Sequence, residues 1–145
     1  MSELSVVSVA DRAGFYIFAA ALRSSDHFKT LESPGPLTVF APSDAAFNRF
    51  STAALDRLLK QDRELLHIVL GYHFAAGKVA TARLAGKRIR AVMQAGGDVI
   101  IDGRSGLRVN TARLVKPDLD AANGVVHGVD AVLWPRTRAA AIAAS

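Results

Sequence analysis

A serine lies where a strand-like segment turns into a helix-like one, and this arrangement could carry nucleophilic chemistry. The segment from Thr38 to Phe50, TVFAPSDAAFNRF, places Ser43 at the turn. In a nucleophile elbow, glycines beside the serine allow the strained backbone to make that turn. The neighbours here are Ala41, Pro42, Asp44 and Ala45. We therefore interpret Ser43 as a helix N-cap, with Asp44 complementing the positive helix end, and expect no enzymatic activity.

The four histidines do not have the spacing of a metal site. His67 and His73 are six residues apart, which on a helix points them to opposite sides, whereas a metal-binding pair needs a spacing of three or four. Without cysteine, the chain has no thiolate nucleophile, disulfide or cysteine-ligated zinc. The glycines of AGGDVIIDG lead into predicted strands, not to a helix N-terminus that could hold phosphate. We predict no metal and no cofactor.

Positive charge is concentrated in the third quarter of the chain. The formal net charge is +5, but nine lysines and arginines and two aspartates between Lys78 and Lys116 leave that segment at +7. Such a surface could hold acidic polysaccharide, nucleic acid or a lipid headgroup surface, and the alternative is a solvated strand face. No aromatic residue lies in this segment, so bases would have no stacking platform, and we predict no nucleic-acid partner. The candidate patch for an anionic ligand comprises Lys87, Arg88, Arg90, Arg104 and Arg108.

Apolar stripes predict helices in the first half of the chain. One stripe consists of Phe15, Phe18, Ala19 and Leu22. The short piece HFKTL and the turn ESPGP follow, and then a strand over 37–40. A second stripe predicts a single helix through Phe47, Phe50, Ala54 and Leu58. A third helix is expected to start near Asp62, to bury Leu65, Leu66, Val69 and Tyr72, and to stop before Gly77.

Period-two patterns predict strands in the second half. The segments KRIRAVM, DVIIDGRSGLRVN, ARLVKPDLD and GVVHGVDAVLWP all have this character, and residues 102–106 form a hairpin turn. Helices first and antiparallel strands second indicate an α+β fold. We expect one domain over 1–136 and a frayed tail over 137–145.

No segment reaches the roughly 18 to 20 apolar residues that a transmembrane helix needs. The longest apolar run, AGFYIFAAAL, has ten residues, and its lead-in carries Glu3 and Asp11 where a signal peptide would be basic. We therefore expect a buried helix there, no transmembrane segment, and no signal peptide within the chain. The absence of cysteine does not fix the compartment.

Three segments in order resemble the signatures of the fasciclin domain family. TVFAPSDAAF is similar to the first signature, LLHIVLGYHFAAGKV to the central helix ending in Tyr-His, and NGVVHGVDAVLWP to the closing signature. The resemblance runs from about Val6 to Pro135. The residues that carry it as a structural signature are Thr38, Phe40, Pro42, Ser43, Phe47, Asn123, Gly124 and His127.

This resemblance implies a β-wedge packed with several helices, without enzymatic activity or cofactor, in secreted or surface-anchored adhesion proteins. In some animal members an acidic residue-Pro-Asp-Ile run contacts integrins. Pro117 and Asp118 match that run, Leu119 is a close substitute, and Lys116 reverses the expected charge. Tyr72-His73 matches the other segment that the family links to adhesion. The alternative for Asp118, Leu119, Tyr72 and His73 is a structural role.

The sequence therefore predicts a non-catalytic adhesion or surface-binding module outside the cytoplasm, from a bacterial source. The expected partner is a cell-surface protein or an acidic polysaccharide, bound through the surface of Lys87, Arg88 and Arg90. We expect a monomer or a weak homo-oligomer. An intracellular interaction scaffold and, further away, a serine hydrolase using Ser43 are the alternatives.

Overall fold

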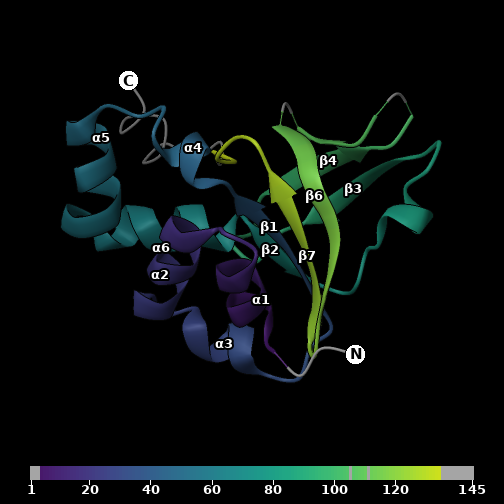
Figure 1. The fold of residues 1–145 in the computed structure, drawn as a ribbon, viewed down its shortest axis with the longest axis horizontal. Coiled ribbons are helices and arrows are strands. Elements are labelled where there is room, and N and C mark those ends of the chain that lie inside the picture. Colours follow the sequence, from purple (N-terminus) through teal and green to yellow (C-terminus); the bar gives the residue numbers. More distant parts are fainter. Residues whose placement is uncertain (1–3, 105, 111, 135–145) are drawn as a thin grey trace.

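Helices gather on one side of a twisted sheet, whose far end projects away from them (Figure 1). The computed structural model describes residues 4–104, 106–110 and 112–134. The helices and helical turns are α1 (Val6–Arg12), α2 (Tyr16–Ser24), α3 (Phe28–Glu32), α4 (Asp44–Phe47), α5 (Thr52–Asp56), the π-helical turn η1 (Arg57–Gln61), α6 (Arg63–Gly71) and the 3₁₀ turn η2 (Thr81–Arg83). The strands are β1 (Leu37–Pro42), β2 (Phe74–Ala76), β3 (Arg88–Val92), β4 (Asp98–Asp102), β5 (Arg108–Val109), β6 (Ala112–Ala121) and β7 (Gly124–Val129).

The seven strands form one mixed sheet in the order β2-β1-β7-β6-β5-β4-β3. All neighbours are antiparallel except β1 and β7, which run parallel with Val39 beside Val126. Every residue of β1 and β7 is buried, whereas burial alternates along β3. Strands buried on both faces are mostly apolar along their whole length, and a strand at the sheet edge needs only one apolar face. This is why the two halves of the sheet differ in composition.

Two apolar cores lie on opposite faces of the central strands. Val39 and Val126 face the helices, where they pack with Phe18, Leu22 and Leu70. Phe40 and Val129 belong to the other core, with Leu84, Ile101 and Val109. Successive residues of a strand point to opposite faces, so adjacent Val39 and Phe40 contribute to different cores. Each fully buried side chain of this size stabilises the fold by about 1.5–3 kcal/mol.

The predicted α+β fold is confirmed, with helices mainly in the first half and strands in the second. The stripe that predicted the first buried helix lies within α2 or just before it, and Phe15, Phe18, Ala19 and Leu22 are all buried. The strand at 37–40 and the hairpin turn after Asp102 are also present. Residues 137–145, predicted to fray, lie outside the described residues.

The single helix predicted through Phe47 and Leu58 is wrong. The chain leaves the helix after Phe47, and Ser51 starts a new one by accepting a hydrogen bond from Ala54 N at 3.1 Å. The apolar pattern continues across this break and gives no sign of it. The N-cap residue Ser51 is the local signal for a second, separate helix.

The helix predicted to run from Asp62 nearly to Gly77 is too long. Asp62 is its N-cap, and the helix α6 ends at Gly71. Phe74–Ala76 then forms β2, which pairs antiparallel with β1. The short helix α1, which buries Val6, Val7, Val9 and Ala10, was not predicted from the sequence.

Candidate functional site

Ser43 is a helix N-cap, as its sequence context predicted. Its Oγ accepts a hydrogen bond from Ala46 N at 3.2 Å, and its own N–H donates to Val129 O at 3.0 Å. The neighbouring Asp44 has a function that the sequence did not reveal. Its Oδ1 accepts from Ile17 N at 2.9 Å, in the first turn of α2, a helix without a side-chain cap of its own. The strand-turn-helix segment therefore starts one helix and caps another.

The polar residues of the predicted signature connect separate parts of the fold. Buried Thr38 donates through Oγ1 to Gly77 O at 2.7 Å and accepts from Val79 N at 2.9 Å. Asn123 donates through Nδ2 to Leu31 O and Ser33 O, and its Oδ1 accepts from Val6 N. At Gly124 a Cβ atom would lie 2.0 Å from Leu37 O, so only glycine fits beside β1. Phe40, Pro42 and Phe47 are buried.

Two buried histidines have both ring nitrogens engaged by the backbone. His73 donates through Nδ1 to Val69 O at 2.6 Å, and its Nε2 accepts from Leu133 N at 2.9 Å. His127 accepts at Nδ1 from Asp118 N at 3.0 Å, and its Nε2 donates to Val79 O at 2.6 Å. Burial lowers the pKa of His73 to about 4 and also lowers the pKa of His127. Both rings are neutral near pH 7 and are held by contacts that a second proton would disrupt.

Tyr72 is buried, and its hydroxyl joins the start of β4 to the turn after β5. The hydroxyl donates to Asp98 O and accepts from Asn110 Nδ2 at 3.3 Å. Tyr72 and His73 therefore point their polar atoms into internal hydrogen bonds. The structure places them in different contacts, with Tyr72 facing the second core and His73 lying against Phe18.

Asp118 lies at an irregularity of β6, where the register with β7 shifts between Lys116 and Leu119. It has a left-handed backbone conformation, with φ of 58°. Its carboxylate accepts from Thr81 N at 2.9 Å and from Thr81 Oγ1, and its side chain is 42% exposed. Leu119 is half-buried against the helical core. The carboxylate proposed for adhesion thus fastens the loop around η2 to β6.

The candidate basic patch separates into paired and unpaired arginines. Arg90 forms an ion pair with Asp98 at 2.5 Å, and Arg104 forms one with Asp102 at 3.0 Å. Among the described residues, Arg88 and Arg108 form no side-chain hydrogen bond or ion pair. Lys87 is exposed at the start of β3. Asp98 and Asp102 therefore neutralise part of the patch.

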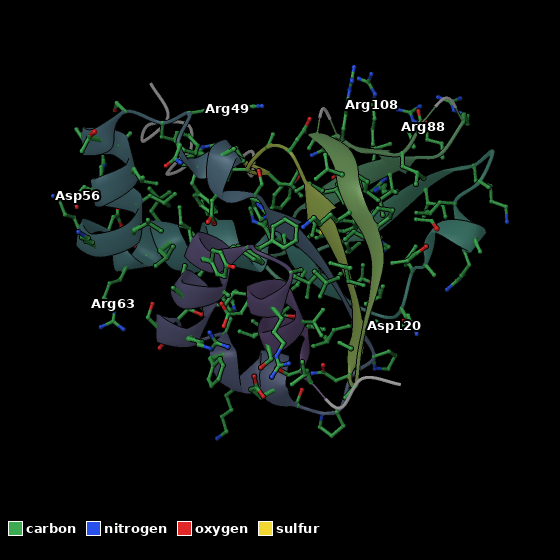
Figure 2. All side chains as sticks on the ribbon, viewed as in Figure 1. Arg49, Asp56, Arg63, Arg88, Arg108 and Asp120 are labelled. Carbon is green, nitrogen blue, oxygen red and sulfur yellow. The ribbon has the colours of Figure 1, made fainter. Side chains whose placement is uncertain are left out.

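Arg88 and Arg108 line the same cleft on the exposed face of the sheet. Asp102 lies opposite Arg88 on one side and opposite Arg108 on the other, so all three side chains share that face. Figure 2 shows both arginines projecting at the hairpin end of the sheet, far from Arg49 and Arg63 over the helices. The cleft has a volume of about 730 Å³, and Tyr72, Asp98, Ile100, Asn110, Leu133 and Trp134 also line it.

The lining of the cleft carries both signs of charge, with Arg88 and Arg108 beside Asp98 and Asp102. Hydrogen bonds from the side chain and the backbone of Arg104 lower the pKa of Asp102 to about 2, so this carboxylate stays ionised and holds Arg104. The charge of Arg88 also lowers the pKa of Asp102, but within the described residues neither Arg88 nor Arg108 forms a side-chain hydrogen bond or ion pair. A guanidinium group donates hydrogen bonds in a planar fork that matches carboxylate and sulfate oxygens. The register between β3, β4 and β5 cannot be read from composition. The sequence therefore could not distinguish these two arginines from the other three basic residues of the patch.

The described residues, 4–104, 106–110 and 112–134, hold no group of three histidine, aspartate or glutamate side chains arranged to bind a metal. His27 is instead stacked on His67, with ring centroids 4.0 Å apart, and its Nε2 lies 2.8 Å from His67 O. In the same part of the chain, no helix is long and apolar enough to cross a bilayer.

Comparison with known proteins identifies the family. A family model of the fasciclin domain matches residues 13–135. The chain belongs to the fasciclin domain family. It is 34% identical to the uncharacterized protein sll1735 of Synechocystis sp. over 134 residues, which cover 92% of this chain and 98% of that protein.

Other relatives of this fasciclin domain are parts of longer proteins. It is 39% identical to the cell surface glycolipoprotein MPB83 of Mycobacterium bovis over 101 residues, which cover 70% of this chain and 44% of that protein. Its fold resembles the FAS1 domain pair of the insect cell adhesion molecule fasciclin I, with a TM-score of 0.64 and 19% identity, over 86% of this chain and 46% of the insect one. The last likeness establishes the fold alone.

Proposed function

We propose that this fasciclin domain is a non-catalytic surface-binding module whose ligand is an acidic polysaccharide, held in the cleft between Arg88 and Arg108. The observation that carries the proposal is the presence of two unpaired guanidinium groups on one face of a cleft, in a patch whose other arginines are neutralised. The names of the mycobacterial glycolipoprotein and the insect adhesion molecule support a place at the cell surface.

We place the ligand at these arginines because the other candidate adhesion residues are already engaged. Tyr72, His73 and Asp118 use their polar atoms to hold the fold together. A ligand that recruited them would have to break these contacts first. By contrast, an anion can approach Arg88 and Arg108 without displacing any internal hydrogen bond.

Titration with polygalacturonate at low and moderate salt tests this function. We expect binding that weakens as the salt concentration rises, because exposed charges are screened within roughly 10 Å at 0.1 M salt. The variant R88Q/R108Q should bind at least about tenfold more weakly, which corresponds to roughly 1.4 kcal/mol for loss of both guanidinium contacts.

The matched control is R49Q/R63Q, which removes the same charge from exposed arginines on the helical side of the molecule. It should bind polygalacturonate nearly as well as the unaltered protein. Equal losses in the two variants would mean that net charge rather than the cleft governs binding. No salt-dependent binding by the unaltered protein would overturn the proposal, and surface labelling of intact cells would distinguish it from an intracellular scaffold.

A further inference from the structure

Strand β3 leaves one edge of the sheet open along residues 88–92, and just beyond it Gln94 N donates to Phe74 O of β2. Strand β3 is the last strand in the sheet order and pairs with β4 alone. The opposite edge is the three-residue strand β2, whereas β3 is five residues long. An edge strand of this length is a template for a further strand unless charges or a covering segment block it.

The hydrogen bonds of the β3–β4 hairpin show which backbone groups face outward. Met93 N donates to Gly97 O, and Gly103 N donates to Lys87 O, so the odd-numbered residues of β3 face β4. Alternate residues of an antiparallel strand direct their backbone groups to opposite sides. The N–H and C=O groups of Arg88, Arg90 and Val92 therefore face away from the sheet, and within the described residues no hydrogen bond uses them.

The side chains along this edge specify what a further strand would carry. Arg88, Arg90 and Val92 point to the exposed face, where the Arg90 side chain is 71% exposed and Val92 is 66% exposed. Ile89 and Ala91 point to the other face and are partly buried against the second core. An incoming strand would thus meet Arg88 and the Asp98-paired Arg90 on one face and the open edge of an apolar core on the other.

We propose that β3 is a docking edge for an extended segment of a partner protein, in which acidic and apolar residues alternate. The segment would pair with the outward backbone groups of Arg88, Arg90 and Val92 as an eighth strand. Its acidic side chains would lie beside the two arginines, and its apolar side chains would extend the core past Ile89 and Ala91. A second copy of this chain fits less well, because antiparallel pairing of two β3 edges centred on Arg90 would bring like charges together.

The probe is a synthetic peptide of alternating glutamate and valine, seven residues long, with a lysine–valine peptide of the same length as its control. Amide hydrogen exchange of the unaltered protein is measured residue by residue with each peptide. At a glutamate–valine concentration ten times its Kd, exchange at Arg88, Arg90 and Val92 should slow about tenfold. The lysine–valine peptide should leave it unchanged. Protection by neither peptide, or by both equally, overturns the proposal.

Two variants separate the edge from the cleft. V92P removes an outward N–H without changing charge or a ladder hydrogen bond, so it should abolish peptide protection, whereas V92T should retain it. R108Q lies on β5, away from the edge, and should weaken polygalacturonate binding while leaving the peptide effect intact. Protection that appears without peptide and grows with protein concentration would show instead that a second copy occupies the edge. If V92P does not fold, the two peptides on the unaltered protein still provide the test.

Discussion

Single buried residues make this domain sensitive to acid, and His73 illustrates the cause. Its ring lies among apolar side chains, and burial lowers its pKa from 6.5 to about 4. In the unfolded chain the ring takes up a proton near pH 6.5, so the unfolded state binds more protons between pH 6.5 and 4. The free energy of unfolding therefore decreases as the pH falls through this window. The lowered pKa values of His27 and His127 act in the same direction.

We expect His73 to contribute a loss of about 3 kcal/mol in the free energy of unfolding between pH 7 and pH 4. Urea denaturation at several pH values measures the total loss, to which titrating carboxylates also contribute. The variant His73→Gln, although less stable at pH 7, should have a flatter dependence between pH 6.5 and 4. An unchanged slope in this variant would contradict the assignment of the effect to His73.

Ser43 gives a second test at the same scale, because capping and catalysis predict different results. Ser43→Ala removes the hydrogen bond to Ala46 N and should cost about 0.5–2 kcal/mol of stability. Ser43→Asn can restore a side-chain cap and should recover most of that loss. Thermal unfolding measures both variants. Hydrolysis of a generic ester by the unaltered protein, lost in Ser43→Ala with the fold intact, would show that the serine is a nucleophile.

At the scale of elements, the sequence predicts a helix or strand well where a single apolar pattern is bounded by a single pair of start and stop signals. The stripe around Phe18 is such a case, and α2 contains all of it except Phe15, which precedes the helix. Prediction fails where a capping residue interrupts the apolar pattern, as at Ser51. It also fails where pairing with a neighbouring strand decides the conformation, as for β2. The segment after Tyr72 becomes a strand because β1 offers it a partner, and this partner cannot be inferred from residues 74–76 themselves.

Asp118 and Thr81 link β6 to the loop around η2, in addition to the ion pair between Lys78 and Asp120. Asp118 accepts two hydrogen bonds from Thr81, so Asp118→Ala should cost about 1–2 kcal/mol. Thr81→Val removes the hydroxyl but keeps the shape of the side chain. A double-mutant cycle measured by urea denaturation should show coupling, because the second substitution removes a contact that the first has already broken. Additive losses would mean that the two side chains act independently.

At the scale of the whole molecule, the arrangement depends on contacts between distant parts of the chain. The parallel pair β1–β7 joins residues 37–42 to residues 124–129, with apolar cores on both faces. Composition and periodicity indicated both strands, but neither contains information on which strand lies beside which. The unpaired state of Arg88 and Arg108 has the same origin, because it depends on the registers of three strands. The site was thus predictable as a charged segment and not as a cleft.

Asn123 provides the test at this scale, because its side chain holds three separate segments at the β6–β7 turn. It donates to Leu31 O and Ser33 O at the C-terminal end of α3 and accepts from Val6 N at the start of α1. Asn123→Ala should cost about 2–4 kcal/mol, since several backbone groups lose their partner at once. The control is Asn48→Ala, an exposed asparagine that ends α4 and should change stability by less than about 0.5 kcal/mol.

Hydrogen exchange of Asn123→Ala should also show which elements of the fold depend on this side chain. Amides of α1 and α3 should exchange faster relative to the unaltered protein, and those of the β3–β4 hairpin should change least, because no contact of Asn123 reaches them. This pattern would mean that the turn residue fastens the helical layer to the sheet while the arginine cleft stays formed. A uniform increase over all elements would mean instead that the helices and the hairpin open as one cooperative unit. The end of the sheet that carries the arginine cleft would then depend on the same asparagine as the helices.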